Sequence, residues 1–177
     1  MDMEKITTAR HEVLAAVEAE LQEELIAAEL STVMMKEDTE ALRVLFDEMG
    51  FDNADGALGE FFFLPVGSDQ DTVGHFIASI TLADRYDMER SPELYAAMAI
   101  LNTYIPCGAF SVSRDETVLM YKLVTPMPVA LTKEALREEV DICMGNAIAV
   151  CDRYADLLLK VLDGEMDKDA VMEAMGM

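Results

Sequence analysis

The stretch from Thr132 to Asp163, TKEALREEVDICMGNAIAVCDRYADLLLKVLD, decides how this chain folds. Its apolar residues recur at alternating steps of four and three, which is the period of an α-helix, and they form two stripes. One stripe can pack on a sheet, whereas the other requires another helix or another protein. The first stripe contains Leu136, Val140, Cys143, Ala147, Val150, Tyr154, Leu157 and Val161, and the second contains Met144, Ile148, Cys151, Ala155, Leu158 and Leu162.

A shorter helix is predicted ahead of this one, over residues 92–105. The sequence Ser91-Pro92-Glu93 is typical of a helix start, because a serine can cap the first amides and proline suits the first turn. An acidic residue there also lies near the positive end of the helix. Pro106 and Gly108 are expected to end the helix.

Two β-hairpins are predicted from alternating apolar residues separated by turn residues. The first combines strands at 60–64 and 73–82, and the second combines strands at 109–113 and 118–124. Pro126 and Pro128 are expected to end the last strand, after which Thr132 caps the long helix.

The N-terminal third is predicted to be helical, with one helix over residues 4–30 and another from Asp38 to Gly50. The expected fold is therefore a two-layer α+β domain, in which an antiparallel sheet of two hairpins packs against helices. We expect residues 1–36 to form an N-terminal helical extension and residues 37–177 to form a single domain.

The net charge restricts the possible partners. The chain of 177 residues has 13 Lys and Arg against 35 Asp and Glu, which gives a formal charge of −22. Such a surface repels nucleic acids and anionic membranes, and it favours basic or amphipathic partners. Solubility alone is an equally good explanation for the acidity. The length suits one hydrophobic core rather than two.

The three cysteines do not indicate a disulfide framework or a zinc site. Cys107, Cys143 and Cys151 are odd in number and lack CxxC spacing, which favours core thiols in a reducing cytosol. Residues 1–9 are too acidic and polar for a signal peptide, and no apolar run approaches the ~20 residues of a membrane span. We therefore expect a cytoplasmic protein.

No catalytic, cofactor-binding or metal-binding motif is recognised. Residues 52–56 suggest a calcium loop, but Phe would occupy its first and twelfth positions, so a turn is favoured. His11 and His75 are isolated in the sequence, and His75 is expected on a strand face. Asn102 lies beside an apolar stripe. It either contacts a ligand or, as we favour, ties the following turn to the next strand.

The chain resembles the YbjN family over about residues 38–163. The similarity lies in the segment from Leu94 to Asn102, the segment Gly108-Ala109-Phe110-Ser111-Val112, the hairpin to Leu123 and the helix entry from Leu131 to Leu136. That family shares its fold with the type III secretion chaperones. The resemblance implies an antiparallel sheet with helices on one side, often in a homodimer, and a protein-binding module without catalytic residues.

Three functions remain open from the sequence. The first is a non-enzymatic, chaperone-like module that binds an amphipathic segment of another polypeptide. The others are a small enzyme with an unrecognised acidic site and a structural homodimer subunit. We expect the long helix to be covered by the N-terminal helix or by a second subunit. The predicted partner-binding residues are Val150, Leu157, Leu158 and Val161.

Overall fold

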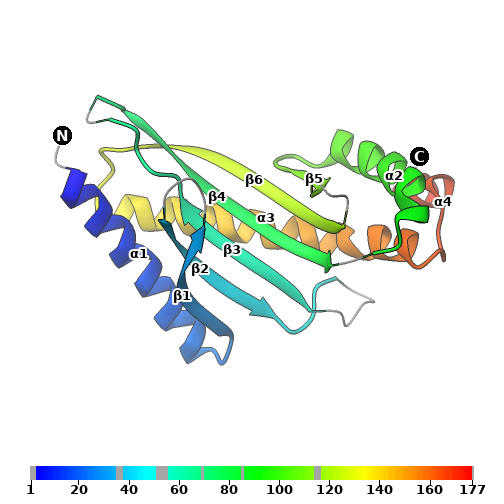
Figure 1. Ribbon diagram of the computed structural model, residues 1–177, viewed down its shortest axis with the longest axis horizontal. Coiled ribbons are helices and arrows are strands. Elements are labelled where there is room, and N and C mark those ends of the chain that lie inside the picture. The colour runs from blue at the N-terminus through cyan, green and yellow to red at the C-terminus, as the bar shows by residue number, and fades with distance from the viewer. Residues whose placement is uncertain are drawn as a thin grey trace. The chain divides into compact units, whose positions relative to one another are not determined.

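The computed structural model describes residues 3–34, 38–50, 56–68, 70–84, 86–113 and 117–176. These residues form an α+β fold, as predicted, with helices and a six-stranded antiparallel sheet (Figure 1). The elements in chain order are α1 (Met3–Glu23), β1 (Ala27–Met34), β2 (Asp38–Phe46), β3 (Ala57–Phe63), β4 (Val73–Asp84), the 3-10 helix η1 (Met88–Arg90), α2 (Ser91–Tyr104), β5 (Ala109–Val112), β6 (Val118–Pro128), α3 (Lys133–Leu162) and α4 (Lys168–Ala174).

The sheet has the strand order β1-β2-β3-β4-β6-β5, so β1 and β5 are its outer strands. Both predicted hairpins are present, as β3–β4 and β5–β6. A third hairpin, β1–β2, replaces the helix predicted from Asp38 and the last residues of the helix predicted over 4–30. Its strands pair antiparallel, from Ala27 opposite Leu45 to Met34 opposite Asp38. These two strands lie on either side of the boundary predicted between the N-terminal extension, residues 1–36, and the domain, residues 37–177.

Burial on both faces explains why β2 was mistaken for a helix. Ala41, Leu42 and Val44 are fully buried although they point to alternate faces of the strand. Ala41 packs with Phe62 and Ile77, with Val33 and Leu64 alongside. A short apolar run that is buried on both faces has no strand period, so its spacing also fits a helix.

The chain separates into two compact units. The first contains residues 1–46, 58–79 and 123–145, and the second contains residues 47–57, 80–122 and 146–177. The first unit includes α1 and the β1–β2 hairpin, and α1 lies alongside β1 in Figure 1. The second unit includes α2, β5 and α4, and α2 contacts both β5 and α4.

The long helix is confirmed as α3, and Thr132 caps it by accepting a hydrogen bond from the Ala135 N–H at 3.3 Å. Most of both apolar stripes is buried within the single chain, so α3 needs no second subunit to cover it. Only Ile148, Leu157 and Leu162 are half-buried among the stripe residues. Among the described residues, no helix is long and apolar enough to cross a membrane.

Two boundary predictions were wrong. Ser91 does not cap α2, because Arg90 occupies the N-cap position and Ser91 is the first helical residue. β6 also continues through Pro126 to Pro128. β5 begins at Ala109, which pairs with Lys122 of β6. The residues of β6 that follow Lys122 therefore have no neighbour in β5. Proline is tolerated where no partner needs its missing N–H.

Candidate functional site

Leu25 has the least expected backbone conformation in the described part of the chain. Its φ is +64°, and no other non-glycine residue among those described has a positive φ. The Leu25 N–H donates to the Gln22 carbonyl at 3.1 Å, and the Ile26 N–H donates to the Leu21 carbonyl at 2.9 Å. These two bonds define a Schellman motif at the end of α1, whose left-handed position is normally occupied by glycine. A leucine there costs about 1–2 kcal/mol.

Burial of the Leu25 side chain within the chain does not offset this cost. It is 94% exposed, and it is the most exposed large hydrophobic residue that we find among those described. A strained backbone conformation combined with an exposed apolar side chain has no explanation in folding stability. Strained backbone conformations cluster at functional sites, and we therefore take Leu25 as the centre of the candidate site.

Leu25 lies on an open groove of about 640 Å³ in the first unit. Leu45 of β2 and Leu58 of β3 also line the groove, and they are 51% and 36% exposed. Both come from neighbouring strands. Three exposed leucines thus converge from the end of α1 and from the sheet. Ile26 and Ala27 extend this apolar lining along the chain.

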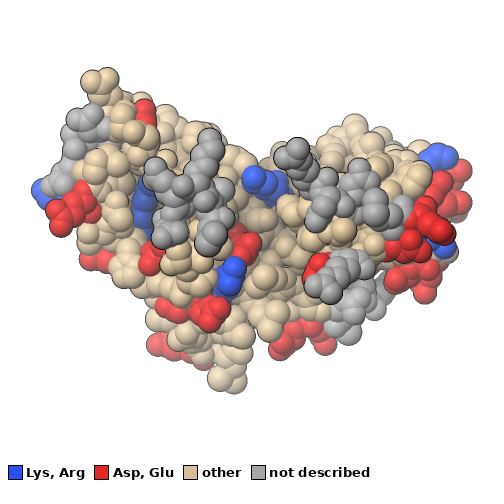
Figure 2. Space-filling model, viewed as in Figure 1, with Lys and Arg blue, Asp and Glu red and all other residues tan. Residues whose placement is uncertain are grey.

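The charged groups around the groove are mostly acidic. Glu29 lines it directly, and the exposed residues Glu23 and Glu24 immediately precede Leu25. Arg43 also lines the groove, but its guanidinium forms an ion pair with Glu60 at 3.1 Å. Acidic side chains likewise dominate the charged positions on the face drawn in Figure 2. The groove therefore combines apolar walls with a negative surrounding.

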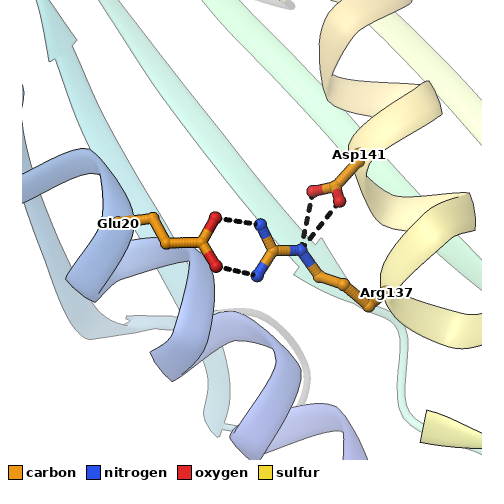
Figure 3. Close-up of polar contacts among 3 residues, drawn as sticks. All are labelled: Glu20, Arg137 and Asp141. Carbon is orange, nitrogen blue, oxygen red and sulfur yellow. Dashed lines mark hydrogen bonds and ion pairs between the residues drawn. The ribbon is translucent and has the colours of Figure 1, made fainter. Parts of the chain in front are cut away.

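Ion pairs fix the helix that ends at Leu25. Arg137 of α3 donates two hydrogen bonds to the Glu20 carboxylate, at 3.0 and 2.6 Å, and its Nε donates to Asp141 at 2.8 Å (Figure 3). The hydrogen bond from Arg137 lowers the pKa of Glu20, and the same bond raises the pKa of Arg137. Glu12 and Lys133 form a further link between the two helices at 2.6 Å.

Two side chains of α1 bind the outer edge of β1. The Leu30 N–H donates to the Glu18 carboxylate at 2.8 Å, and the Gln22 side-chain amide donates to the Ala28 carbonyl, also at 2.8 Å. Glu18 and Gln22 are one helical turn apart, so both lie on the same face of α1. They satisfy backbone groups that an edge strand would otherwise present to another chain.

The opposite edge strand is closed in the same way by Asn102. The Phe110 N–H donates to the Asn102 side-chain oxygen at 2.8 Å, and the Asn102 amide donates to the Phe110 carbonyl at 3.0 Å. This confirms the structural interpretation of Asn102. Next to it, the buried Tyr121 hydroxyl donates to the Cys107 carbonyl at 2.7 Å, and burial raises the pKa of Tyr121.

Three of the four predicted partner-binding residues need correction. Val150, Leu158 and Val161 are 6%, 0% and 0% exposed, so these side chains present no surface to a partner. Only Leu157 is half-buried. Sequence reasoning also missed Leu25, because the helix predicted over residues 4–30 continues through it. No glycine, asparagine or proline occurs between residues 20 and 30 to indicate that the helix ends there.

The histidines and cysteines are the remaining candidate residues of the sequence. Within the described ranges, no group of three or more His, Cys, Asp or Glu side chains could hold a metal ion. His75 is exposed on β4, and His11 contacts Glu40 at 2.9 Å. Cys107, Cys143 and Cys151 are not joined in disulfides, and burial raises the pKa of Cys151. The predicted turn at residues 52–56 lies outside the described residues apart from Gly56.

In comparisons with known proteins, no family model matches this chain and no curated protein matches it.

Proposed function

We propose that this protein is a non-enzymatic binding module that holds a segment of another polypeptide in the groove beside Leu25. The observation that carries the proposal is Leu25 itself, which is 94% exposed and has a φ of +64°. Burial of the leucine side chain by a partner contributes about 1.5–3 kcal/mol, which is enough to offset a backbone cost of roughly 1–2 kcal/mol. The strain is thus offset only in the complex.

The surrounding sheet supports the same function. Leu45 and Leu58 are presented by hydrogen-bonded strands, so their backbones are ordered before a partner arrives. Pre-ordered apolar side chains reduce the entropy that binding would otherwise lose. The resemblance to the YbjN family also supports a protein-binding role, in a reducing cytosol. We propose no cofactor and no catalytic residue.

The Leu25→Asn variant tests the proposal. Asparagine tolerates the left-handed conformation, so the variant keeps the helix end while losing the apolar side chain. Val124→Thr is the matched control, because Val124 is an exposed apolar residue of β6 outside the groove lining. The native chain, the variant and the control are immobilised in parallel. Proteins retained from lysate of the source cells are then compared by mass spectrometry.

We expect a discrete protein to be retained by the native chain and by Val124→Thr but not by Leu25→Asn. Identical captures by all three chains would contradict the proposal. A mass measurement in solution identifies the alternative in which the occupant is a second copy of this chain. In that case the native protein is a dimer and Leu25→Asn is a monomer.

A further inference from the structure

We infer that the groove beside Leu25 accepts an apolar residue flanked by lysine or arginine, on a segment that binds through its side chains rather than as an added strand. This inference rests on the proposed function and specifies the partner. It follows from the charges around the groove and from the helix side chains that already bind outward backbone groups of both outer strands.

The charge around the groove selects for a basic partner. Glu23, Glu24 and Glu29 are exposed and lie at or next to the groove. Arg43, the cation among the described residues of the lining, is paired with Glu60. Lysine or arginine on either side of an apolar residue would complement these carboxylates while the apolar residue contacts the leucines.

The same charge disfavours a second copy of this chain as the occupant. Each copy has a formal charge of −22, so two copies repel each other before their apolar groups can meet. Exposed charges interact over roughly 10 Å at 0.1 M salt, which reaches across a groove of this size. The partner is therefore expected to be a different polypeptide with the opposite local charge.

Strand addition at β1 is opposed by α1. An added strand would need the outward N–H of Leu30 and the outward carbonyl of Ala28, which bind Glu18 and Gln22 at 2.8 Å each. An added strand would have to displace these side chains, and its own hydrogen bonds would be of similar strength, so it would gain little. The displaced Glu18 carboxylate would be left without the Leu30 N–H.

Strand addition at β5 is opposed by Asn102. A single side-chain amide satisfies both the N–H and the carbonyl of Phe110, as a neighbouring strand would. β5 is also only four residues long, which leaves little further backbone for a partner strand. Because these backbone groups of β1 and β5 are already bound, we expect a partner to be recognised through side chains in the groove.

Four synthetic peptides test this inference by fluorescence anisotropy. The first has a Leu-Phe-Leu core between two runs of three lysines. The second replaces the lysines by glutamates, and the third replaces the core by serines. The fourth keeps the first sequence but carries N-methyl groups on alternate backbone amides, which prevents it from pairing as a strand. Each is titrated into the native protein, Leu25→Asn and Val124→Thr.

We expect the first and fourth peptides to bind the native protein and Val124→Thr with similar affinity. The glutamate and serine peptides should bind roughly tenfold more weakly or worse, because each lacks one of the two attractive contributions. Leu25→Asn should weaken the binding of the first peptide by a similar factor. Higher salt should weaken the binding of the first peptide but leave a residual apolar affinity.

Several results would overturn the inference while leaving the proposed function to the lysate experiment. These are stronger binding of the glutamate peptide, loss of binding on N-methylation, and the absence of binding by all four peptides. Equal binding of the first peptide to Leu25→Asn and to the native protein would do the same, because it would show attraction by overall charge without use of the groove.

Discussion

Asn102 of α2 forms two hydrogen bonds with the backbone of Phe110, accepting from its N–H at 2.8 Å and donating to its carbonyl at 3.0 Å. The two residues belong to different elements, and the side-chain amide takes the position of a further strand beside β5. Glu18 and Gln22 of α1 do the equivalent at β1. Both outer strands of the sheet are thus protected by helix side chains, which is a recognised defence against edge-to-edge association.

The first prediction concerns this contact. Asn102→Ala should lower the free energy of unfolding by about 1–3 kcal/mol, because two backbone groups of Phe110 lose their partner. Asn102→Asp should also be destabilising, since a carboxylate accepts from the N–H but cannot donate to the carbonyl. Urea unfolding measures both. Thr103→Ala, at the exposed neighbouring position, is the control and should change stability little. Equal effects at the two positions would contradict the role of Asn102.

The second prediction isolates the backbone strain at Leu25. Leu25→Gly and Leu25→Ala remove the same apolar contacts, but only glycine relieves the left-handed conformation. We expect the glycine variant to be more stable than the alanine variant by about 1 kcal/mol. In a regular helix the order is the reverse, because glycine is about 1 kcal/mol less favourable than alanine. Thermal unfolding of the two variants gives the sign of their stability difference. A more stable alanine variant would show that the backbone at Leu25 is not strained.

The third prediction concerns the pH dependence of the Glu20–Arg137 ion pair. The hydrogen bond from Arg137 lowers the pKa of Glu20 in the folded state. Its stabilisation is therefore complete above the unfolded pKa of about 4.3 and is lost as the pH falls through the lower folded pKa. Because the Glu20 side chain is 62% exposed, the pair should contribute only about 0.2–1 kcal/mol.

The measurement compares the native chain with Glu20→Gln across this pH range. The native chain should be the more stable at neutral pH, and the difference should shrink as the solution becomes more acidic. Taking the difference removes the general effect of protonating many surface carboxylates, which both chains share. A difference that grows at acidic pH would have the wrong sign for this ion pair.

The fourth prediction concerns Tyr121, whose pKa is raised by burial and, to a smaller extent, by its hydrogen bond to Cys107. A phenol whose folded pKa is raised contributes stability that is present below the unfolded pKa of about 10 and lost as the pH rises beyond it. We expect the Tyr121 phenolate to form only when the protein unfolds in alkali. Tyrosinate absorbance and circular dichroism, followed together against Tyr121→Phe, measure this. Ionisation of Tyr121 in a folded chain would contradict it.

The sequence predicts those elements whose boundaries have local chemical signals. Thr132 marks the start of α3, and the turn residues between β3 and β4 and between β5 and β6 locate two hairpins. The β1–β2 hairpin was missed because Leu42, Leu45, Phe46 and Met49 recur at a helical spacing. In the strand, Ala41 is buried on one face and Leu42 and Val44 on the other, which hides the period of two. For such a segment, packing against the neighbouring strands decides between helix and strand, and this packing cannot be inferred from the segment's own sequence.

The candidate site was missed for a related reason. α1 ends at a leucine in a conformation that glycine normally adopts, so the sequence contains no sign that the helix ends. The two stripes of α3 were recognised correctly, but apolar spacing does not show whether the chain itself buries them. Burial of Val150, Leu158 and Val161 leaves the groove beside Leu25 as the better candidate surface.

Amide chemical shifts show whether the groove beside Leu25 is the binding surface. The lysine-flanked Leu-Phe-Leu peptide is titrated into isotope-labelled native protein, and two-dimensional NMR spectra are recorded at each step. We expect the amides of Leu25, Leu45 and Leu58 to shift in a saturable manner, with smaller changes elsewhere. Saturable shifts confined to other residues, with these three amides unchanged, would contradict it.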